Sequence, residues 1–321
     1  MKLLLTFALL FTTVCCFAQR QNVYFLKNNG KYVTTRDSSD YVRVVREPDS
    51  ASALYNVFEF YPNGKNKLIG KSSVIDPPKF EGQCMEYYAN GKRKSIANYK
   101  SGQFTGEEYE FYPNGKPYRV KKYPDSIDVN DMLQDDYLVI TEFDSLGNAL
   151  VIDGNGYYKG LDDHFKNIEE EGNLKDGYRS GMWKGHDWGS KIIYMETYDN
   201  GKLISGVSVG EKGHSVKYSK SRDVEPQYKG GLQAFLNYVG NNVVYPDYER
   251  AHNIQGRVIL KFIVERSGKV SDVEVLSPVS EAIDKEAVRV ITESPDWIPG
   301  TEYGRKIRVS YTIPLMFTLN N

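Results

Sequence analysis

The sequence has few of the residues that nucleic-acid binding, metal binding and disulfide-rich folds require. Of its 321 residues, 41 are Lys or Arg and 42 are Asp or Glu, so the formal charge is −1 and no basic surface for nucleic acid is expected. Three cysteines exclude a disulfide framework, and four dispersed histidines give no zinc-ligand spacing. We therefore expect no catalytic residues, no metal and no cofactor, and no small-molecule substrate is evident.

Proline is also scarce, with 13 residues and no run longer than two, which excludes a stiff polyproline spacer between domains. Tyrosine and glycine, in contrast, are abundant, with 25 and 28 residues. Tyr favours half-buried strands and Gly favours tight turns, so this composition indicates a protein rich in β structure. The length is sufficient for about two domains of roughly 150 residues each.

An uncharged apolar run lies at the start of the chain. It comprises sixteen residues, Leu3 to Ala18, with small residues three and one positions before Gln19. The run is short for a membrane span, which needs about 20 residues, and it has the pattern of a secretory signal. We expect residues 1–18 to be a cleaved signal peptide and the product to lie in the periplasm. The alternatives are retention as a membrane anchor and lipid attachment at Cys15 or Cys16.

The tripeptide Asn-Gly-Lys recurs along most of the chain. An aromatic residue stands two positions before all copies but the first, and the copies begin at Asn29, Asn63, Asn90, Asn114 and Asn200. Asn-Gly accepts positive φ at both central positions of a type I′ turn, and the flanking residues alternate as in half-buried strands. We expect each copy to form a type I′ hairpin, stacked on its neighbours in an extended antiparallel sheet over residues 19–206.

The repeat unit resembles the MORN-type repeat family, in which Tyr-Tyr-x-Asn-Gly-Lys is followed by Gly-x-x-x-Gly. Residues 102–106 and 177–183 match the second half of that pattern. The resemblance covers about residues 24–206. It implies an elongated all-β scaffold of hairpins and names no chemistry.

The sequence pattern changes after residue 206. Residues 207–226 are polar and are expected to form a protease-sensitive connector. Beyond them, helical spacing and strand-like alternation predict a small α+β domain over residues 227–321. A hairpin is expected around Ser267-Gly268, and a last strand from about Arg305 to Leu319. Two helices are expected to bury one face each, through Leu232, Phe235, Leu236 and Val239 in the first and Ile283, Ala287, Val290 and Ile291 in the second.

Residues 227–319 resemble the TonB C-terminal domain family in the order and spacing of several short motifs. The matching segments are residues 245–246, 254–258, 262–264, 268–270, 284–287, 297–300 and 309–317. The resemblance implies that this domain pairs a strand with a peptide segment of an outer-membrane TonB-dependent transporter, which is β-strand addition in physical terms. The implied function is a periplasmic TonB-like binding protein in transport across the cell envelope.

Two features of complete TonB proteins are missing from the sequence. Complete members have an N-terminal helix with an intramembrane histidine and then a long Pro-rich spacer. Here residues 3–18 contain no ionisable side chain, and the repeats take the place of the spacer. We therefore expect transporter docking, and the sequence leaves open whether proton flow energises it. The alternative function is an envelope scaffold or peptide-binding protein in which the repeat sheet is the working surface.

The last strand supplies most of the residues expected to bind a partner. It ends a small sheet, so one of its sides is expected to be open to a partner strand, and its basic side chains are expected to attract an acidic peptide. The alternative is that charge and Pro314 only protect an exposed edge from aggregation. The oligomeric state is left open. The expected binding residues are Lys306, Arg308, Val309, Ser310, Tyr311, Thr312 and Ile313, with Tyr245 and Pro246.

The first prediction concerns the start of the mature protein. If residues 1–18 are a cleaved signal, protein purified from the periplasm of cells expressing the full chain will begin near Gln19. Intact-mass analysis and N-terminal sequencing measure this directly. An intact Met1, or a lipid on Cys15 or Cys16, would contradict the prediction.

Overall fold

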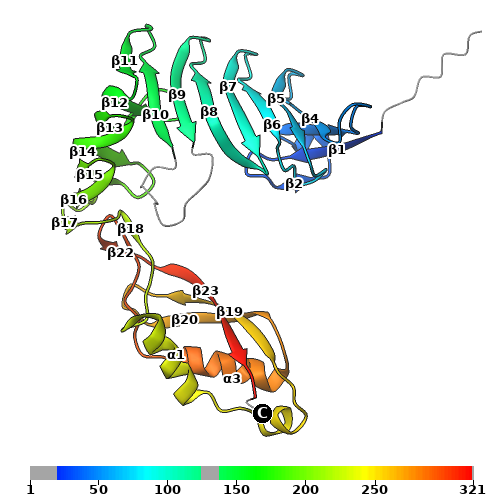
Figure 1. Ribbon diagram of the computed structural model, residues 1–321, viewed down its shortest axis with the longest axis vertical. Helices are drawn as coiled ribbons and strands as arrows, with labels where there is room; N and C mark the ends of the chain where they lie inside the picture. The colour runs from blue at the N-terminus through cyan, green and yellow to red at the C-terminus, as the bar shows by residue number, and fades with distance from the viewer. Residues whose placement is uncertain (1–19, 124–136, 320–321) are drawn as a thin grey trace, which may run out of the picture. The chain divides into compact units, whose positions relative to one another are not determined.

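The computed structural model describes residues 20–123 and 137–319, so the expected signal peptide lies outside the described residues. The chain divides into two compact units. The described part of the first unit comprises residues 20–123 and 137–155, and that of the second comprises residues 156–319. Figure 1 shows the strands and helices of each unit.

The first unit is built from antiparallel strands and one short 3-10 helix, η1 (Arg36–Ser38). The strand β1 pairs with both β2 and β3, and each strand from β3 to β11 pairs with the next. The strands are β1 (Gln21–Leu26), β2 (Tyr32–Val33), β3 (Tyr41–Arg46), β4 (Tyr55–Phe60), β5 (Asn66–Ser72), β6 (Gly82–Tyr87), β7 (Arg93–Lys100), β8 (Gln103–Phe111), β9 (Pro117–Tyr123), β10 (Leu138–Phe143) and β11 (Ala149–Ile152).

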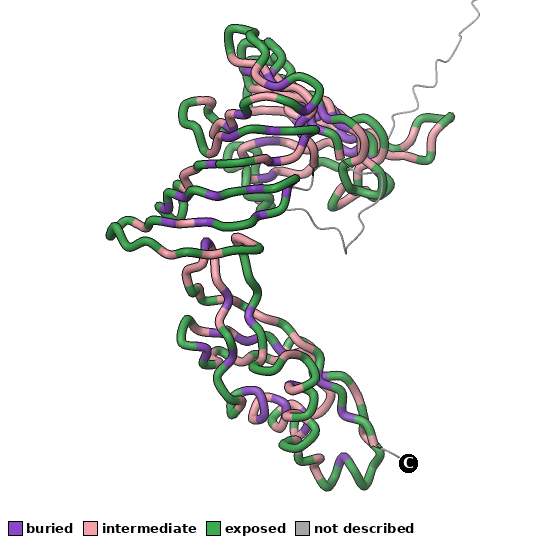
Figure 2. The backbone as a smooth tube through the Cα atoms, turned by 60° about the vertical axis from the view of Figure 1, so that its left-hand side comes forward, coloured by how far each residue is buried: buried purple, intermediate pink, exposed green. Residues whose placement is uncertain are grey.

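The repeat strands of the second unit follow the same rule, and each pairs antiparallel with the next. They are β12 (Asn155–Leu161), β13 (Ile168–Lys175), β14 (Tyr178–Asp187), β15 (Ile192–Asp199), β16 (Lys202–Val209) and β17 (Ser215–Tyr218). The strands β1–β17 belong to a 17-stranded sheet, so the expected large antiparallel sheet is confirmed. Buried and exposed residues alternate along its strands, as Figure 2 shows.

Four of the five Asn-Gly-Lys turns differ from the expected type I′ geometry. Only the last copy has positive φ at both residues, 48° at Asn200 and 78° at Gly201. In the other four copies only the glycine has positive φ. In the turn after β4, for example, Gly64 N–H donates to Tyr61 O at 2.9 Å, and the strand register shifts beside the turn. This is a type I turn closed by a one-residue bulge, and Pro62 favours it because its fixed φ suits the first central position.

Hydrogen bonds between successive hairpins explain why Tyr, Asn and Lys recur in the motif. In each case a side chain in one turn donates to a backbone carbonyl of the next hairpin. The bonds are Tyr61 to Tyr87 (2.7 Å), Asn63 to Ala89 (2.9 Å), Lys65 to Asn90 (2.7 Å), Tyr88 to Phe111 (2.7 Å), Asn90 to Pro113 (2.8 Å) and Tyr112 to Phe143 (2.8 Å). A bond of this kind contributes about 1 kcal/mol, so the repeated motif fastens each hairpin to its neighbour.

Glycines inside the strands of the second unit make room for aromatic rings on the neighbouring strand. A Cβ atom built on Gly172 would lie 2.4 Å from Trp183, and one built on Gly206 would lie 2.4 Å from Tyr218. Trp183 is only 2% exposed, and it also lies beside the ring of Tyr158. Each such ring covers the backbone of the preceding strand, so the sheet buries aromatic surface without a second layer.

The C-terminal part of the second unit has the expected α+β composition. Its elements are β18 (Asp223–Val224), α1 (Gly231–Asn242), α2 (Asp247–Ala251), β19 (Gly256–Val264), β20 (Val270–Ser277), α3 (Glu281–Thr292), β21 (Thr301–Glu302), β22 (Arg305–Lys306) and β23 (Val309–Phe317). Two three-stranded sheets form, in the orders β20-β19-β23 and β18-β21-β22. Phe262 of β19 and Trp297 pack in one core with the inner face of α3.

The buried face predicted from the sequence is correct for α3 and only partly correct for α1. In α3, Ser280 caps the N-terminus by accepting from the Ile283 N–H, and all four expected residues are buried, as predicted. In α1 the expected face is wrong in half of its members, because Leu232 and Leu236 are 73% and 50% exposed. The helix packs through the other two expected residues, Phe235 and Val239, and through Tyr238, whose hydroxyl donates to Val290 O. Apolar spacing alone could not identify which side of this short helix meets the core.

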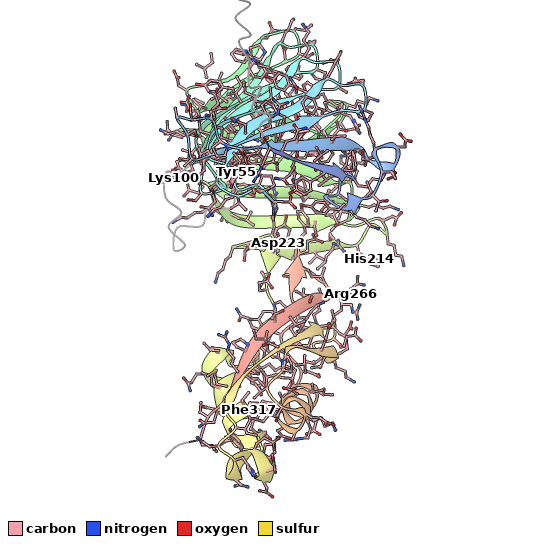
Figure 3. All side chains as sticks on the ribbon, turned by 90° about the vertical axis from the view of Figure 1, so that its right-hand side faces the viewer. Tyr55, Lys100, His214, Asp223, Arg266 and Phe317 are labelled. Atoms are coloured by element: carbon pink, nitrogen blue, oxygen red, sulfur yellow. The ribbon has the colours of Figure 1, made fainter. Side chains whose placement is uncertain are left out.

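Ordered structure occupies part of the segment expected to be a polar connector. Residues 207–226 contain the end of β16 and the strands β17 and β18. His214, just before β17, and Asp223, at the start of β18, mark this segment in Figure 3. Strand β17 completes the repeat sheet, and β18 pairs with β21 of the C-terminal part.

The second prediction tests the contact between glycine and aromatic ring. Replacing Gly172 with Ala will lower the free energy of unfolding by about 1–3 kcal/mol, because the added methyl group overlaps the buried Trp183 ring. The matched control is Gly240→Ala in α1, where a Cβ meets nothing within 4 Å. Urea denaturation of both variants gives the comparison. Equal stability of Gly172→Ala and the wild type would show that the ring is free to move aside.

Candidate functional site

The candidate site is the outer side of β23. This strand pairs along its whole length with β19, from Val264 opposite Val309 to Gly256 opposite Phe317. In the order β20-β19-β23 it stands at the edge of the sheet, so among the described residues β19 is its only strand partner within that sheet. An edge strand of nine residues presents a row of backbone groups to which an extended peptide can pair.

The direction of the backbone amides along this edge follows from two observations. Pro314 has no N–H, and a proline inside a strand is tolerated where its nitrogen faces away from the ladder. The Ile307 N–H, at an odd-numbered position, donates to Gly300 O at 2.9 Å within the domain. Amide direction alternates from residue to residue, so Ser310 and Thr312 direct their N–H groups to the open side.

The side chains alternate as expected from the sequence. Val309, Tyr311 and Ile313 are half-buried, and Tyr311 and Ile313 pack against the domain core. Ser310 and Thr312 are exposed on the opposite face. The structure therefore brings seven of the nine expected binding residues into one continuous segment, from Lys306 to Ile313.

Of the three basic side chains between Arg305 and Arg308, two are engaged inside the protein. Arg308 binds Glu265 at 2.8 Å and also Asp272, and Arg305 donates to the carbonyl oxygens of Ser208 and His214. Lys306 is exposed. The expected attraction of an acidic peptide would therefore depend mainly on Lys306 in this arrangement.

Tyr245 and Pro246 lie apart from that segment in the contacts they make. The Tyr245 hydroxyl donates to Ile254 O at 2.7 Å, and its ring meets Phe317, at the far end of β23, with centroids 5.9 Å apart. Pro246 precedes α2 and its carbonyl accepts from Arg250 N–H. These contacts give both residues a structural part in holding the loop before β19.

A second polar cluster, which we call the junction cluster, joins the last repeat strands to the C-terminal part. It consists of Glu170, Arg179, Tyr194, Glu196, Tyr218, Arg222 and Tyr303. Arg222 binds Glu196 at 2.6 Å and Glu170 at 3.3 Å, and Arg179 binds Glu170 at 2.7 Å. The Glu196 side chain is fully buried. Burial alone would raise the pKa of Glu170, but the charges of Arg179 and Arg222 lower it to about 2.

Sequence reasoning missed the junction cluster. Arg222 lies in a polar stretch with no periodicity, and its partners lie 26 and 52 residues earlier. The only local signal was Tyr303-Gly304, a pair typical of a tight turn; both residues have positive φ, 48° and 74°. A contact between a turn and a strand so distant in sequence leaves no pattern that a single chain reveals.

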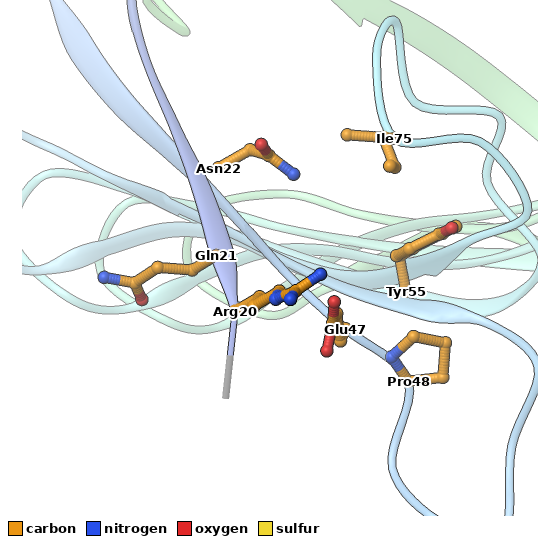
Figure 4. A pocket seen from close by; sticks show the side chains of 7 residues that line it. All are labelled: Arg20, Gln21, Asn22, Glu47, Pro48, Tyr55 and Ile75. Atoms are coloured by element: carbon orange, nitrogen blue, oxygen red, sulfur yellow. The ribbon is translucent and has the colours of Figure 1, made fainter. Parts of the chain in front are cut away.

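A shallow pocket in the first unit offers no comparable chemistry. It has a volume of about 350 Å³ and is lined by Arg20, Gln21, Asn22, Glu47, Pro48, Tyr55 and Ile75 (Figure 4). Its polar groups come from the start of β1 and from the end of β3.

Across residues 20–123 and 137–319, no helix has the length and apolar character needed to span a membrane.

The third prediction follows from the pKa of Glu170. Its value in the folded protein, about 2, lies below the ordinary 4.5, so the stability that its ionised form contributes is complete above pH 4.5 and is lost as the pH falls towards 2. This contribution is about 3 kcal/mol at most. The wild type will therefore lose more stability between pH 5 and pH 3 than Glu170→Gln, measured by urea denaturation. Parallel curves for the two proteins would contradict the prediction. Glu211→Gln, in an exposed pair with Lys191, is the control.

Comparisons with known proteins concern the C-terminal part alone. Residues 241–319 match the family model described as Gram-negative bacterial TonB protein C-terminal. Among solved structures, the chain is similar to the NMR solution structure of the Helicobacter pylori TonB-CTD, with 17% identity over 29% of this chain and 90% of that chain and a TM-score of 0.22. No curated protein matches. The family is one of non-enzymatic binding domains in envelope transport, and the α+β region that ends this chain matches the TonB C-terminal family.

Proposed function

We propose that this protein binds an extended peptide segment of an outer-membrane TonB-dependent transporter by strand addition at β23. The observation that carries the proposal is the position of β23, an edge strand whose Ser310 and Thr312 amides face outward, inside a region that matches the TonB C-terminal family. Domains of this family in general interact with such transporters. Backbone pairing supplies the affinity, and Lys306 favours an acidic residue at one end of the peptide.

The cellular setting follows from the same family. TonB C-terminal domains belong to the envelope, so we place the working protein in the periplasm, released by cleavage of residues 1–18 or retained there by an uncleaved anchor. Residues 3–18 contain no ionisable side chain, so the proposed role is docking without a proton-driven step. Within the chain, residues 227–321 are the proposed binding domain and residues 19–206 the proposed MORN-like scaffold.

One observation supports the alternative in which the repeat sheet is itself a working surface. On the side of the first unit opposite its buried face, apolar residues stand opposite one another across five strands. They are Phe58, Ile69, Met85, Ile96 and Tyr109, and none is fully buried. A stripe of this length is typical of a surface that meets another protein, and it would suit an envelope scaffold.

The fourth prediction tests strand addition at β23. In titrations with synthetic peptides from transporter N-terminal segments, Thr312→Pro will weaken binding about tenfold or more, because it removes an outward N–H and leaves the ladder to β19 in place. Thr312→Ala, the matched control, will bind like the wild type, because backbone pairing tolerates a change of side chain. Calorimetry measures the affinities, and hydrogen exchange locates the peptide.

The outcomes separate the two functions. Protection of residues 306–313 by the peptide, lost in Thr312→Pro, supports docking at the edge. Protection confined to α1 and α3, with residues 306–313 unchanged, would reject the edge site. Peptide protection of strands β4–β8 instead would favour the scaffold function.

A further inference from the structure

The hairpin formed by β21 and β22 projects from the C-terminal part into the end of the repeat sheet. At its tip, the Tyr303 ring stacks on Tyr194 of β15 with centroids 4.9 Å apart and 26° between the planes. The Tyr303 carbonyl accepts from the buried Ser208 hydroxyl of β16 at 2.8 Å. Gly304 passes close to β17, where an added Cβ would lie 2.9 Å from Tyr218. Three repeat strands therefore hold this tip.

Arg222 also holds the tip of the hairpin, through both its backbone and its side chain. Its carbonyl accepts from the Tyr303 N–H at 2.8 Å, and its guanidinium lies 4.5 Å from the centroid of the Tyr194 ring. The guanidinium is only partly exposed and makes ion pairs with two glutamates of the repeat sheet, Glu196 of β15 and Glu170 of β13. Arg222 immediately precedes β18, which pairs with β21. One side chain thus links the repeat strands to the strand that supports the hairpin.

The hairpin also begins the binding edge. Strand β22 ends at Lys306 and β23 begins at Val309, with the Ile307 N–H bonded to Gly300 between them. Lys306 lies in β22, at the edge of the order β18-β21-β22, and its N–H alternates with that of Ile307 to the outer side of that strand, while Arg308 follows in the two-residue link to β23. Their positions depend on the hairpin, whereas Ser310 and Thr312 are held by β19.

We propose that Arg222 is a positioning residue that holds the hairpin in the repeat sheet and so extends the peptide-binding edge from β23 back to Lys306. The partner is an extended peptide long enough to pair with residues 306–312, and its acidic residue lies beside Lys306. This inference rests on the proposed docking function. It assigns to the last repeats a part in binding, since they determine the length of the edge that the C-terminal part presents.

The experiment compares two peptides on the whole mature protein. The long peptide covers the edge from Lys306 to Pro314, and the short peptide is truncated so that it pairs only from Ser310 to Pro314. In the wild type the long peptide will bind about tenfold more tightly, the gain from roughly two further backbone hydrogen bonds. In Arg222→Gln this advantage will disappear, while the affinity for the short peptide stays within about twofold. Arg222→Lys, which keeps the charge, will restore part of the advantage.

Amide hydrogen exchange of the proteins without peptide is an independent measurement of how firmly the hairpin is held. Arg222→Gln will exchange faster at residues 301–308 than the wild type, with residues 256–264 of β19 unchanged. The control Lys191→Ala removes an exposed ion pair of β15's neighbouring turn and will change neither measurement.

Three results would overturn the inference. A long peptide that keeps its advantage in Arg222→Gln would show that the hairpin is positioned without Arg222. An equal loss for both peptides, with faster exchange throughout the C-terminal part, would make Arg222 a residue of general stability only. If neither peptide binds the wild type, the docking function itself fails, and unchanged exchange at residues 301–308 would then remove the positioning role as well.

Discussion

The central constraint on this protein is that, in the part of the chain that the structure describes, no layer of helices covers the repeat sheet. Within the described residues, β1–β17 are accompanied only by the short helix η1, so a sheet face can be buried only by side chains of neighbouring strands. Two devices achieve this. Aromatic rings lie over strand glycines, as Trp183 does over Gly172, and glutamates of the buried face are paired with cations, as Glu59 is with Arg43 and Lys67. Both require hairpins in fixed register, and the turn contacts of Tyr, Asn and Lys provide it.

The same constraint makes the last repeat strands dependent on the C-terminal part. Glu196 is fully buried, and a buried carboxylate without a cation would cost several kcal/mol. Its cation, Arg222, comes from beyond the last repeat, and so does Tyr303, which covers Tyr194. The β21–β22 hairpin therefore packs on the final repeat strands, as each repeat hairpin packs on the hairpin before it. Within residues 207–226, Ser208, Tyr218 and Arg222 are consequently part of this packing, and strands β17 and β18 pair with the two segments that they connect.

Local patterns predicted the elements better than the contacts between them. The strands, the buried face of α3 and the open edge of β23 follow from alternation, helical spacing and chain order. The turn type did not, because Asn-Gly suits two geometries, and four copies with Asn28, Pro62, Ala89 or Pro113 before the Asn share the one in which only the glycine has positive φ. The exposed face of α1 and the junction cluster were also missed. Each is decided by which surface of the core an element meets, and that depends on residues far away in the sequence.

The candidate site depends on local sequence patterns and also on contacts between residues that are distant in the sequence. Its central residues, Ser310 and Thr312, could be predicted because they lie on an alternating strand that ends a small sheet. Its basic side chains could not, since Arg308 is bound by Glu265 and Asp272 and Arg305 by carbonyl groups near β16 and β17. The number of basic residues in this part of the sequence is therefore larger than the number that a partner could contact. In the proposed docking, recognition at this edge would come mainly from backbone groups, and selectivity from the number of these groups that the packed β21–β22 hairpin aligns with β23.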